Sequence, residues 1–350
     1  AQKKLYNARE AFVLQEDMPE EISSNAEAIV KELDDKGLEY IERSKARRSS
    51  ILHVARFIGA WKNSSHSSTR ILSKEAKSIK LSIISLYPES VAGTLNDSYA
   101  NIFMSATLTP LRMYKELFGL GDAVVKQYGT SFPMSNKLIF IDDSVTTKYE
   151  SRTISEYKKI AQKVSEIKRA IPGNIAVFCP SFEMLNSIMR YISDESVYVQ
   201  RRSMGSVELE GVLEKFNRSS NSILFGVMGG SMSEGIDYKD NVLKGIIIVG
   251  VPLSKPSLEI SARIEYYNRK FNGRGMEYAY IAPAVIKGIQ AAGRAIRSET
   301  DKAVIIFMDR RYKWRIYSPA INNDRIKESS DYIGAIRDFW ARDQTIVKPK

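Results

Sequence analysis

The sequence predicts an α/β fold in which helices cover both faces of a mostly parallel sheet. After about Leu81, short apolar and β-branched runs alternate with amphipathic stretches that follow the helical period. Strands that alternate with helices in this way are typical of a parallel sheet. The runs predicted to form strands are Asn101–Met104, Leu138–Ile141, Ile175–Cys179, Val197–Val199, Ile223–Val227, Ile246–Val251 and Val304–Met308.

Helices are predicted between these strands, before them and after them. The connecting helices include Glu156–Ala170, Phe182–Ile192 and Ser206–Phe216. Before the sheet, apolar residues recur at helical spacing from Ile22 to Ile41 and from Ile51 to Trp61. The basic run Arg43–Arg48 fits a solvated helix surface better than a DNA contact, and Lys62–Thr69 is typical of a loop. One further helix and a tail are expected in Asp331–Lys350.

Composition limits the classes of function. The 350 residues are 43% hydrophobic and 27% charged, which suits about two globular domains. The 52 basic residues exceed the 41 acidic residues and give a net charge of +11. This excess favours a polyanionic partner such as nucleic acid, although a basic protein without such a partner fits the charge equally well.

No segment has the pattern of a membrane span or a secretion signal. The longest apolar runs, such as Gly245–Leu253, are too short to cross a bilayer, and Ala1–Lys4 leads directly into charged sequence. The first residue is not Met, which suggests a piece of a longer protein. The one cysteine, Cys179, excludes a disulfide or cysteine metal site within the chain, so we expect a buried thiol, no metal ligands and a reducing intracellular compartment.

The most specific polar motif is Gln290–Arg297, which we expect to lie on a helix. A helix turns by about 100° per residue, so Gln290, Arg294 and Arg297 are predicted to share one face. Gly293 beside them would allow a ligand to approach closely. Because guanidinium groups match phosphate oxygens, this face could grip a triphosphate, although a solvated basic helix fits the same pattern.

A second motif, Gly229–Tyr238, follows the predicted strand Ile223–Val227. Two glycines after a strand form a loop whose backbone can lie against phosphate or sugar. Glu234 and Asp237 could accept hydrogen bonds from ribose hydroxyls or orient an arginine. A turn with Ser-Glu helix capping explains the same residues, and the pattern alone leaves both interpretations open.

Two shorter segments also follow predicted strands, where ligands bind in parallel sheets. Ser105–Pro110 offers hydroxyl groups, but such residues are common in turns that have no function. Pro180–Phe182 offers an aromatic ring that could stack on an unpaired base or pack in the core.

Together and in this order, the motifs resemble the XPD family of superfamily 2 DNA helicases, which are iron–sulfur helicases. The segments similar to helicase motifs III, IV, V and VI are Ser105–Thr107, Phe178–Phe182, Gly229–Tyr238 and Gln290–Arg297. Further similar segments are Val251–Pro256, Ala262–Tyr267, Tyr278–Pro283 and Asp309–Tyr312. The resemblance extends from about Ser50 to Tyr312 and is specific because four motifs occur in the family's order.

The resemblance implies a RecA-like P-loop NTPase motor domain preceded by a helical remnant of an arch domain. Residues 1–48 would be the helical end of the arch insertion, and residues 49–120 the C-terminal part of the first motor domain, with motif III. Residues 121–350 would form the second RecA-like motor domain, with motifs IV, V and VI. Enzymes of this family couple ATP hydrolysis to 5′-to-3′ movement on single-stranded DNA and act in nucleotide excision repair.

The resemblance also implies roles for single residues. Arg297 would be the arginine finger on the γ-phosphate, Arg294 would contact the neighbouring phosphates, and Gln290 would orient water or the γ-phosphate. The residues implied in ATP binding and coupling are Gly235, Asp237, Glu234, Gly293, Ser105 and Thr107. The residues implied in DNA contact are Ser181, Phe182, Ser231, Lys255 and Arg263.

Three features of the family are absent from the sequence. It contains no G-x-x-x-x-G-K-[ST] loop for phosphate, no Asp-Glu-Ala-His box for Mg²⁺ and no set of four cluster cysteines. All three belong to the N-terminal half in this family. We therefore expect a C-terminal half that is inactive alone, and a missing half that carries motifs I, Ia and II and the 4Fe–4S cluster. A smaller departure is Ser231, where many relatives have lysine.

The partners implied by the resemblance are ATP, Mg²⁺, single-stranded DNA, the N-terminal helicase half and repair-complex proteins, with no membrane. The compartment would be the cytoplasm of an archaeal-type cell, or the nucleus of a eukaryotic one. Three alternatives stay open at this point: another iron–sulfur helicase of the DinG or FANCJ-like kind, a non-catalytic module that binds single-stranded DNA, and a nucleotide-binding regulatory domain.

Overall fold

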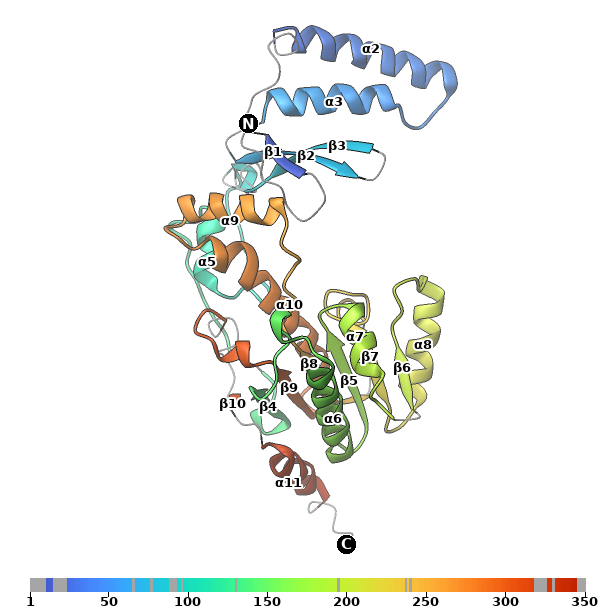
Figure 1. Ribbon diagram of the computed structural model, residues 1–350. Coiled ribbons are helices and arrows are strands. Elements are labelled where there is room, and N and C mark those ends of the chain that lie inside the picture. Colours follow the sequence, from blue (N-terminus) through green and yellow to red (C-terminus); the bar gives the residue numbers. More distant parts are fainter. Residues whose placement is uncertain are drawn as a thin grey trace. The chain divides into compact units, whose positions relative to one another are not determined.

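Two compact units make up the chain in the computed structural model (Figure 1). The first unit comprises Ala1–Ile102, Lys115–Gly121 and Lys255–Ala279, and the second comprises Phe103–Tyr114, Asp122–Ser254 and Tyr280–Lys350. The structure describes residues 11–14, 24–64, 67–75, 78–87, 93–95, 97–129, 131–193, 196–236, 238, 241–317, 326–328 and 331–344.

The first unit contains the two N-terminal helices that the sequence predicts. They are α2 (Ala26–Ser44) and α3 (Ser50–Lys62), and they pack against each other. Gly37 allows the close approach, because a Cβ at this position would lie 2.7 Å from Cδ2 of Leu52. The helical prediction is therefore confirmed, and the basic run Arg43–Arg48 spans the end of α2 and the connection to α3.

A three-stranded antiparallel sheet in the same unit was not predicted from the sequence. Its strands are β1 (Ala11–Leu14), β2 (Ser68–Glu75) and β3 (Ser78–Ser85), in that order. The predicted loop is thus wrong at its last two residues, since β2 begins at Ser68. The missed signal is period-two alternation, in which Ile79, Leu81 and Ile83 are separated by polar residues. Helix α9 (Leu258–Lys270) contacts β2 and β1.

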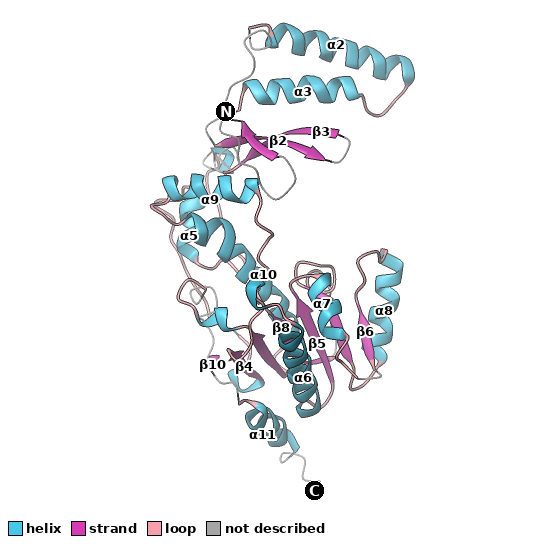
Figure 2. Ribbon diagram, in the orientation of Figure 1, coloured by secondary structure: helices cyan, strands magenta, loops and turns pink. Residues whose placement is uncertain are grey.

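A seven-stranded sheet forms the centre of the second unit (Figure 2). Its strand order is β10-β4-β9-β8-β5-β7-β6, and every neighbouring pair is parallel. The strands are β4 (Lys137–Asp142), β5 (Asn174–Cys179), β6 (Val197–Val199), β7 (Ile223–Val227), β8 (Leu243–Val249), β9 (Ala303–Met308) and β10 (Ile326–Glu328). The predicted parallel sheet is confirmed, and parallel pairing brings the carboxyl ends of these strands to one edge.

Helices cover both faces of this sheet, as predicted. One buried cluster joins the sheet to α6 (Ile154–Ala170), α7 (Phe182–Met189) and α11 (Ile333–Gln344), and the other joins it to α8 (Ser206–Arg218) and α10 (Ala282–Ala292). Successive side chains of β5 alternate between the clusters, with Phe178 in one and Val177 and Cys179 in the other. Among the described residues, no helix combines the length and apolar character needed to cross a membrane.

The strand predicted at Asn101–Met104 is not formed. These residues have no regular secondary structure and precede α5 (Leu111–Leu117). Ile102 and Met104 are 89% and 88% exposed, although both are apolar. An apolar run becomes a strand only where a neighbouring strand accepts its hydrogen bonds, and no strand in the described ranges pairs with this segment.

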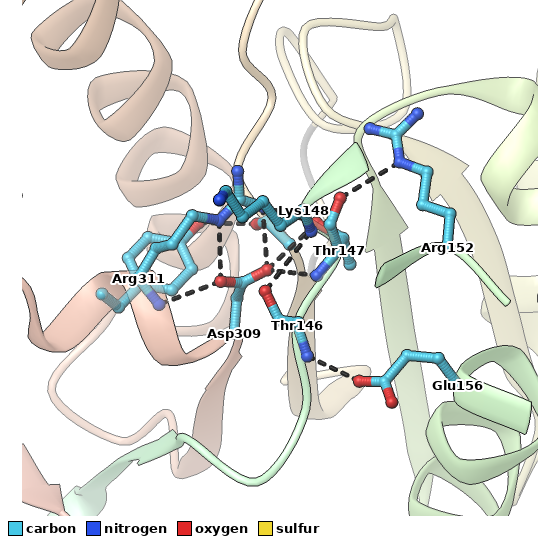
Figure 3. Close-up of polar contacts among 9 residues, drawn as sticks. Thr146, Thr147, Lys148, Arg152, Glu156, Asp309 and Arg311 are labelled. Atoms are coloured by element: carbon cyan, nitrogen blue, oxygen red, sulfur yellow. Dashed lines mark hydrogen bonds and ion pairs between the residues drawn. The ribbon is translucent and has the colours of Figure 1, made fainter. Parts of the chain in front are cut away.

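A buried ion pair joins the segments that follow β4 and β9 (Figure 3). Arg311 is 6% exposed, and its Nε and Nη2 atoms donate to the two carboxylate oxygens of Asp309 at 2.9 and 2.8 Å. The backbone N–H and hydroxyl of Thr147 donate to Asp309 Oδ2 at 2.7 and 3.0 Å. Burial acts to lower the pKa of Arg311, but Asp309 outweighs it and raises that pKa. Asp309 and Arg311 therefore form an ion pair that is almost fully buried.

Gly250, just after β8, makes room for this network. Its φ is +71°, and a Cβ there would lie 2.2 Å from Oγ1 of Thr147. The hydroxyl of Tyr312 also donates to the Gly250 carbonyl at 2.8 Å. The ends of β4, β8 and β9 are thus fixed by one set of contacts.

We expect Gly250→Ala to lower the free energy of unfolding by about 2 kcal/mol or more, because the methyl group displaces Thr147 and the left-handed backbone becomes strained. Urea denaturation measures the change. Gly211→Ala is the matched control, since Gly211 lies within α8 with nothing near its Cβ position; it should gain about 0.5–1 kcal/mol. Equal stability of the two variants would contradict this prediction.

Candidate functional site

The loop Gly229–Ile236 runs beside α10 in the second unit, and three contacts define the arrangement. A Cβ on Gly229 would lie 3.7 Å from Cδ of Lys287. Further along, Arg294 reaches the carbonyl of Ser233 and the carbonyl of Ile236. The loop therefore runs alongside α10 in the same direction. The motifs Gly229–Tyr238 and Gln290–Arg297 lie side by side.

The loop is a compact turn with both buried and exposed residues. The N–H groups of Ser233 and Glu234 donate to the Gly230 carbonyl, each at 3.0 Å. Gly229 and Gly235 have φ of +74° and +81°, a conformation that glycine adopts without strain. Ser231 and Gly235 are exposed, whereas Ser233 is fully buried. Asp237, a predicted coupling residue, lies outside the described residues.

Gln200 anchors the start of this loop and was not predicted. It follows β6 and is buried, and its backbone N–H donates to the Phe225 carbonyl at 2.8 Å. Its side-chain oxygen accepts from the N–H of Val227 at 3.0 Å, which fixes the end of β7. A lone glutamine after a strand carries no sequence signal of this role, because the contact depends on the pairing of β6 with β7.

The prediction that Gln290, Arg294 and Arg297 share one face of a helix is wrong for Arg297. Helix α10 ends at Ala292, a 3-10 turn spans Gly293–Ala295, and the backbone at Ile296 is extended. Glycine has a low helix propensity, so the helix tightens and ends at this position. Arg297 instead follows the helix in an extended segment.

Both arginines nevertheless converge on one carbonyl oxygen. Arg294 donates from Nε to Ser233 O at 3.1 Å and from Nη1 to Ile236 O at 3.2 Å. Arg297 donates from Nη2 to the same Ile236 oxygen at 2.8 Å. Asp301 accepts from the backbone N–H groups of Arg297 and Ser298 at 2.7 and 2.8 Å and so positions the extended segment.

The positive charge of Arg294 also acts on the hydroxyl of Tyr238, which follows the loop. The buried hydroxyl of Tyr238 donates to the Met232 carbonyl at 2.8 Å. Burial raises the pKa of Tyr238, and the positive charge of Arg294 acts against that shift. The phenol therefore stays neutral and serves as a hydrogen-bond donor that holds the loop together.

The predicted motif Ser105–Pro110 contacts the site at Gln290, near the end of α10. The side-chain amide of Gln290 donates to the Thr107 hydroxyl at 3.3 Å. Ser105 in turn lies 3.3 Å from the same hydroxyl, and its oxygen accepts from the Thr107 N–H at 3.1 Å. Residues 183 positions apart in sequence are thus brought together.

The predicted DNA-contact residues are dispersed. Ser181 caps α7 by accepting from the Met184 N–H at 3.3 Å, and the ring of Phe182 lies 5.6 Å from the Arg202 guanidinium carbon. Phe182 is only partly buried, so part of its ring packs against the core and part is exposed. Lys255 and Arg263 belong to the first unit, where Lys255 is exposed and Arg263 pairs with Glu259 at 2.9 Å.

The donor set of the chain fits phosphate and not an iron–sulfur cluster. Arginine, glutamine and threonine side chains offer N–H and O–H donors, which match anionic oxygens. Cys179 is fully buried, and burial raises the pKa of its thiol far above its usual range. A 4Fe–4S cluster is held by four thiolates, and this sequence contains one cysteine.

Residues 164–324 match the family model of the helicase C-terminal domain. Over these residues the chain is similar to helicase C-terminal domains. The matched range includes the loop Gly229–Ile236, helix α10 and both arginines of the site. The resemblance to XPD-like helicases that the motifs suggested is therefore confirmed.

Relatives named as helicases agree with this assignment. The chain is 24% identical over 340 residues to the ATP-dependent DNA helicase XPD of Sulfolobus acidocaldarius, covering 91% of this chain and 58% of that protein. It is 24% identical over 289 residues to the ATP-dependent DNA helicase chl-1 of Caenorhabditis elegans, covering 75% and 35%. The chain thus spans little more than half the length of the first relative and about a third of the second.

Solved XPD structures share the fold. A structure named XPD helicase superposes with a TM-score of 0.59 at 21% identity and covers 91% of this chain and 58% of its own. The Xpd4 structure of S. tokodaii gives 0.62 at 18% identity and covers 93% and 62%. At these identities the similarity establishes the architecture, and the site must be argued from its own contacts.

We expect Arg294→Ala to loosen the Gly229–Ile236 loop of the helicase C-terminal domain. The variant loses two charge-assisted bonds to loop carbonyls, so the amides of Ser233 and Glu234 should exchange with solvent about tenfold faster or more. Hydrogen exchange measures this directly. Arg218→Ala, on an exposed arginine of α8, is the control and should leave both amides protected. Unchanged exchange in Arg294→Ala would show that the arginine does not hold the loop.

Proposed function

We propose that this chain forms the arginine-bearing half of an ATP-dependent DNA helicase motor of the XPD kind. The observation that supports this most is the convergence of Arg294 and Arg297 on the Ile236 carbonyl, beside a loop with two left-handed glycines. Guanidinium groups held in this way are oriented in advance, which lowers the entropic cost of gripping a phosphate.

In this proposal, Arg297 contacts the γ-phosphate of ATP, Arg294 the neighbouring phosphates, and Gln290 a water or the γ-phosphate. An arginine beside a transferring phosphoryl group stabilises the charge that develops on it. The chain has no G-x-x-x-x-G-K-[ST] loop and no Asp-Glu-Ala-His box, so the phosphate cradle and the Mg²⁺ ligands would come from another polypeptide segment. Thr107, which is bonded to Ser105 and accepts from Gln290, would then couple the two halves together with Ser105.

The nucleic-acid partner in this proposal is single-stranded DNA. Net charge +11 favours a polyanion, and relatives with this domain are named as DNA helicases. Ser181, Phe182, Ser231, Lys255 and Arg263 are the proposed contacts, with Glu234, Asp237 and Gly235 linking the nucleotide to the DNA path. Movement from 5′ to 3′ and a part in nucleotide excision repair follow from the XPD resemblance and belong to the same proposal.

The domain organisation proposed with it places an arch remnant in residues 1–48, the end of a first motor in 49–120 and a second motor in 121–350. Helix α2 lies within the first of these ranges, and the sheet covered on both faces lies within the last. A 4Fe–4S cluster, if present in the whole protein, would be held elsewhere, since this chain has a single cysteine. The cytoplasm of an archaeal-type cell, or the nucleus of a eukaryotic one, is the proposed compartment.

A CHL1-like iron–sulfur helicase is the second candidate, because relatives with that name match the same domain. The two candidates share the arginine-bearing site and differ in the DNA structure on which the whole protein acts. Unwinding of simple forked duplexes compared with branched or quadruplex substrates distinguishes them.

We expect Arg297→Ala to reduce ATP turnover by about 10³-fold or more in a protein that joins this chain to a half with the phosphate loop and the magnesium carboxylates. The loss should appear in kcat with little change in KM, because the arginine acts on charge that develops during transfer. DNA-stimulated phosphate release measures both constants.

The matched control is Arg169→Ala, which removes an exposed arginine from the last turn of α6, on the opposite face of the sheet from α10. Its turnover should equal that of the unmodified protein. Near-normal turnover by Arg297→Ala would reject the arginine-finger assignment.

A further inference from the structure

Helix α10 exposes one stripe of side chains along its length. Most of the helix is buried, and its accessible residues are Pro283, Lys287, Ile289 and Gln290. Pro283, Lys287 and Gln290 stand at spacings of four and three, so they line one face, and Arg294 continues it four residues later. Lys287 is the one charged side chain between Ala282 and Ala292.

The other polar members of this stripe have defined partners. Gln290 donates to Thr107, and Arg294 donates to carbonyls of the loop. Lys287 lies at the point where the loop begins. A Cβ built on Gly229 would lie 3.7 and 3.9 Å from Cδ and Cε of Lys287. The aliphatic stem of Lys287 therefore lies beside the start of the loop, where Gly229 has no side chain.

The loop itself supplies no positive charge. Glu234 is the only charged residue within Gly229–Ile236, and its Oε1 atom lies 3.9 Å from the same Cβ position on Gly229. An anion that approached the loop backbone here would meet a carboxylate. A cation from outside the loop is therefore needed, and α10 places one at this position.

We propose that Lys287 is a further phosphate-contact residue of the site, and that its ammonium group binds a phosphate oxygen at the start of the Gly229–Ile236 loop. The proposal rests on the phosphate-binding function proposed above and extends it by one residue. Lysine binds phosphate as a point charge, without the planar geometry that arginine imposes. The phosphate belongs either to the nucleotide or to the backbone of single-stranded DNA, and the two sources share this chemistry.

The test uses the 350-residue chain with two probes, a fluorescent oligothymidylate and a fluorescent ATP analogue. Lys287→Gln removes the charge but keeps a long side chain with good helix propensity, so the helix should stay folded. If the phosphate is that of DNA, this variant should lower the slope of log affinity against log salt by about 0.7 and weaken binding about threefold or more at low salt. If it is that of the nucleotide, the same variant should weaken analogue binding and leave the DNA slope unchanged.

Two further variants identify the cause. Lys287→Arg keeps the charge and should restore binding of whichever probe Lys287→Gln weakens. Glu234→Gln removes the neighbouring negative charge and should strengthen binding of that probe. If Lys287 only formed a surface ion pair with Glu234, Lys287→Gln and Glu234→Gln would both weaken binding of the probe or leave it unchanged. Lys158→Ala on α6, on the opposite face of the sheet, carries the same charge change and should have no effect.

The outcomes separate this proposal from the function on which it rests. Normal binding of both probes by Lys287→Gln would overturn the role of Lys287 and leave the helicase proposal intact. Failure of the unmodified chain to bind either probe at low salt would overturn the role of Lys287 and the DNA contact proposed above, whereas the arginine-finger assignment is tested separately by Arg297→Ala.

Discussion

The ion pair between Asp309 and Arg311 is the contact from which the geometry of the site follows. It is buried, doubly hydrogen-bonded and shared with Thr147, so it joins the ends of β4 and β9 (Figure 3). Tyr312, one residue further, donates to the Gly250 carbonyl after β8. The same hydroxyl would lie 2.9 Å from a Cβ on Gly288, so it also packs closely against α10. Loss of one partner would leave a buried charge unpaired and release all four elements.

Placement of α10 decides what the arginines can do. The helix carries Gln290 to Thr107 and Arg294 to the loop, and its early end at Ala292 lets Arg297 turn back to the Ile236 carbonyl. If the helix continued, Arg294 and Arg297 would project from the same helical face. The 3-10 turn at Gly293 instead directs both guanidinium groups to one oxygen, with Asp301 holding the segment that follows. The change from helix to extended backbone between Gly293 and Ile296 therefore decides where the two charges lie.

Much of the second unit could be predicted from sequence because its strands are short, apolar and fully buried. Runs such as Ile223–Val227 can form little other than a central strand, and the structure has this strand at those residues. The contact between Gln290 and Thr107 was not predicted, because it joins two motifs that are distant in sequence. The hairpin of β2 and β3 was missed although β3 alternates with period two. Two features could not be read: the anchor Gln200 and the absent strand at Asn101–Met104. Each depends on which strands pair, and pairing is a tertiary property that local periodicity does not contain.

ATP hydrolysis by the 350-residue chain, with and without single-stranded DNA, tests the central claim most directly. We expect no turnover by the chain alone, since arginines without a phosphate loop and magnesium carboxylates cannot complete the site. Turnover should appear when a polypeptide with both motifs is added. Clear DNA-stimulated hydrolysis by the chain alone would mean that it contains a phosphate site of its own, and it would contradict the proposal that this chain is the arginine-bearing half of a motor.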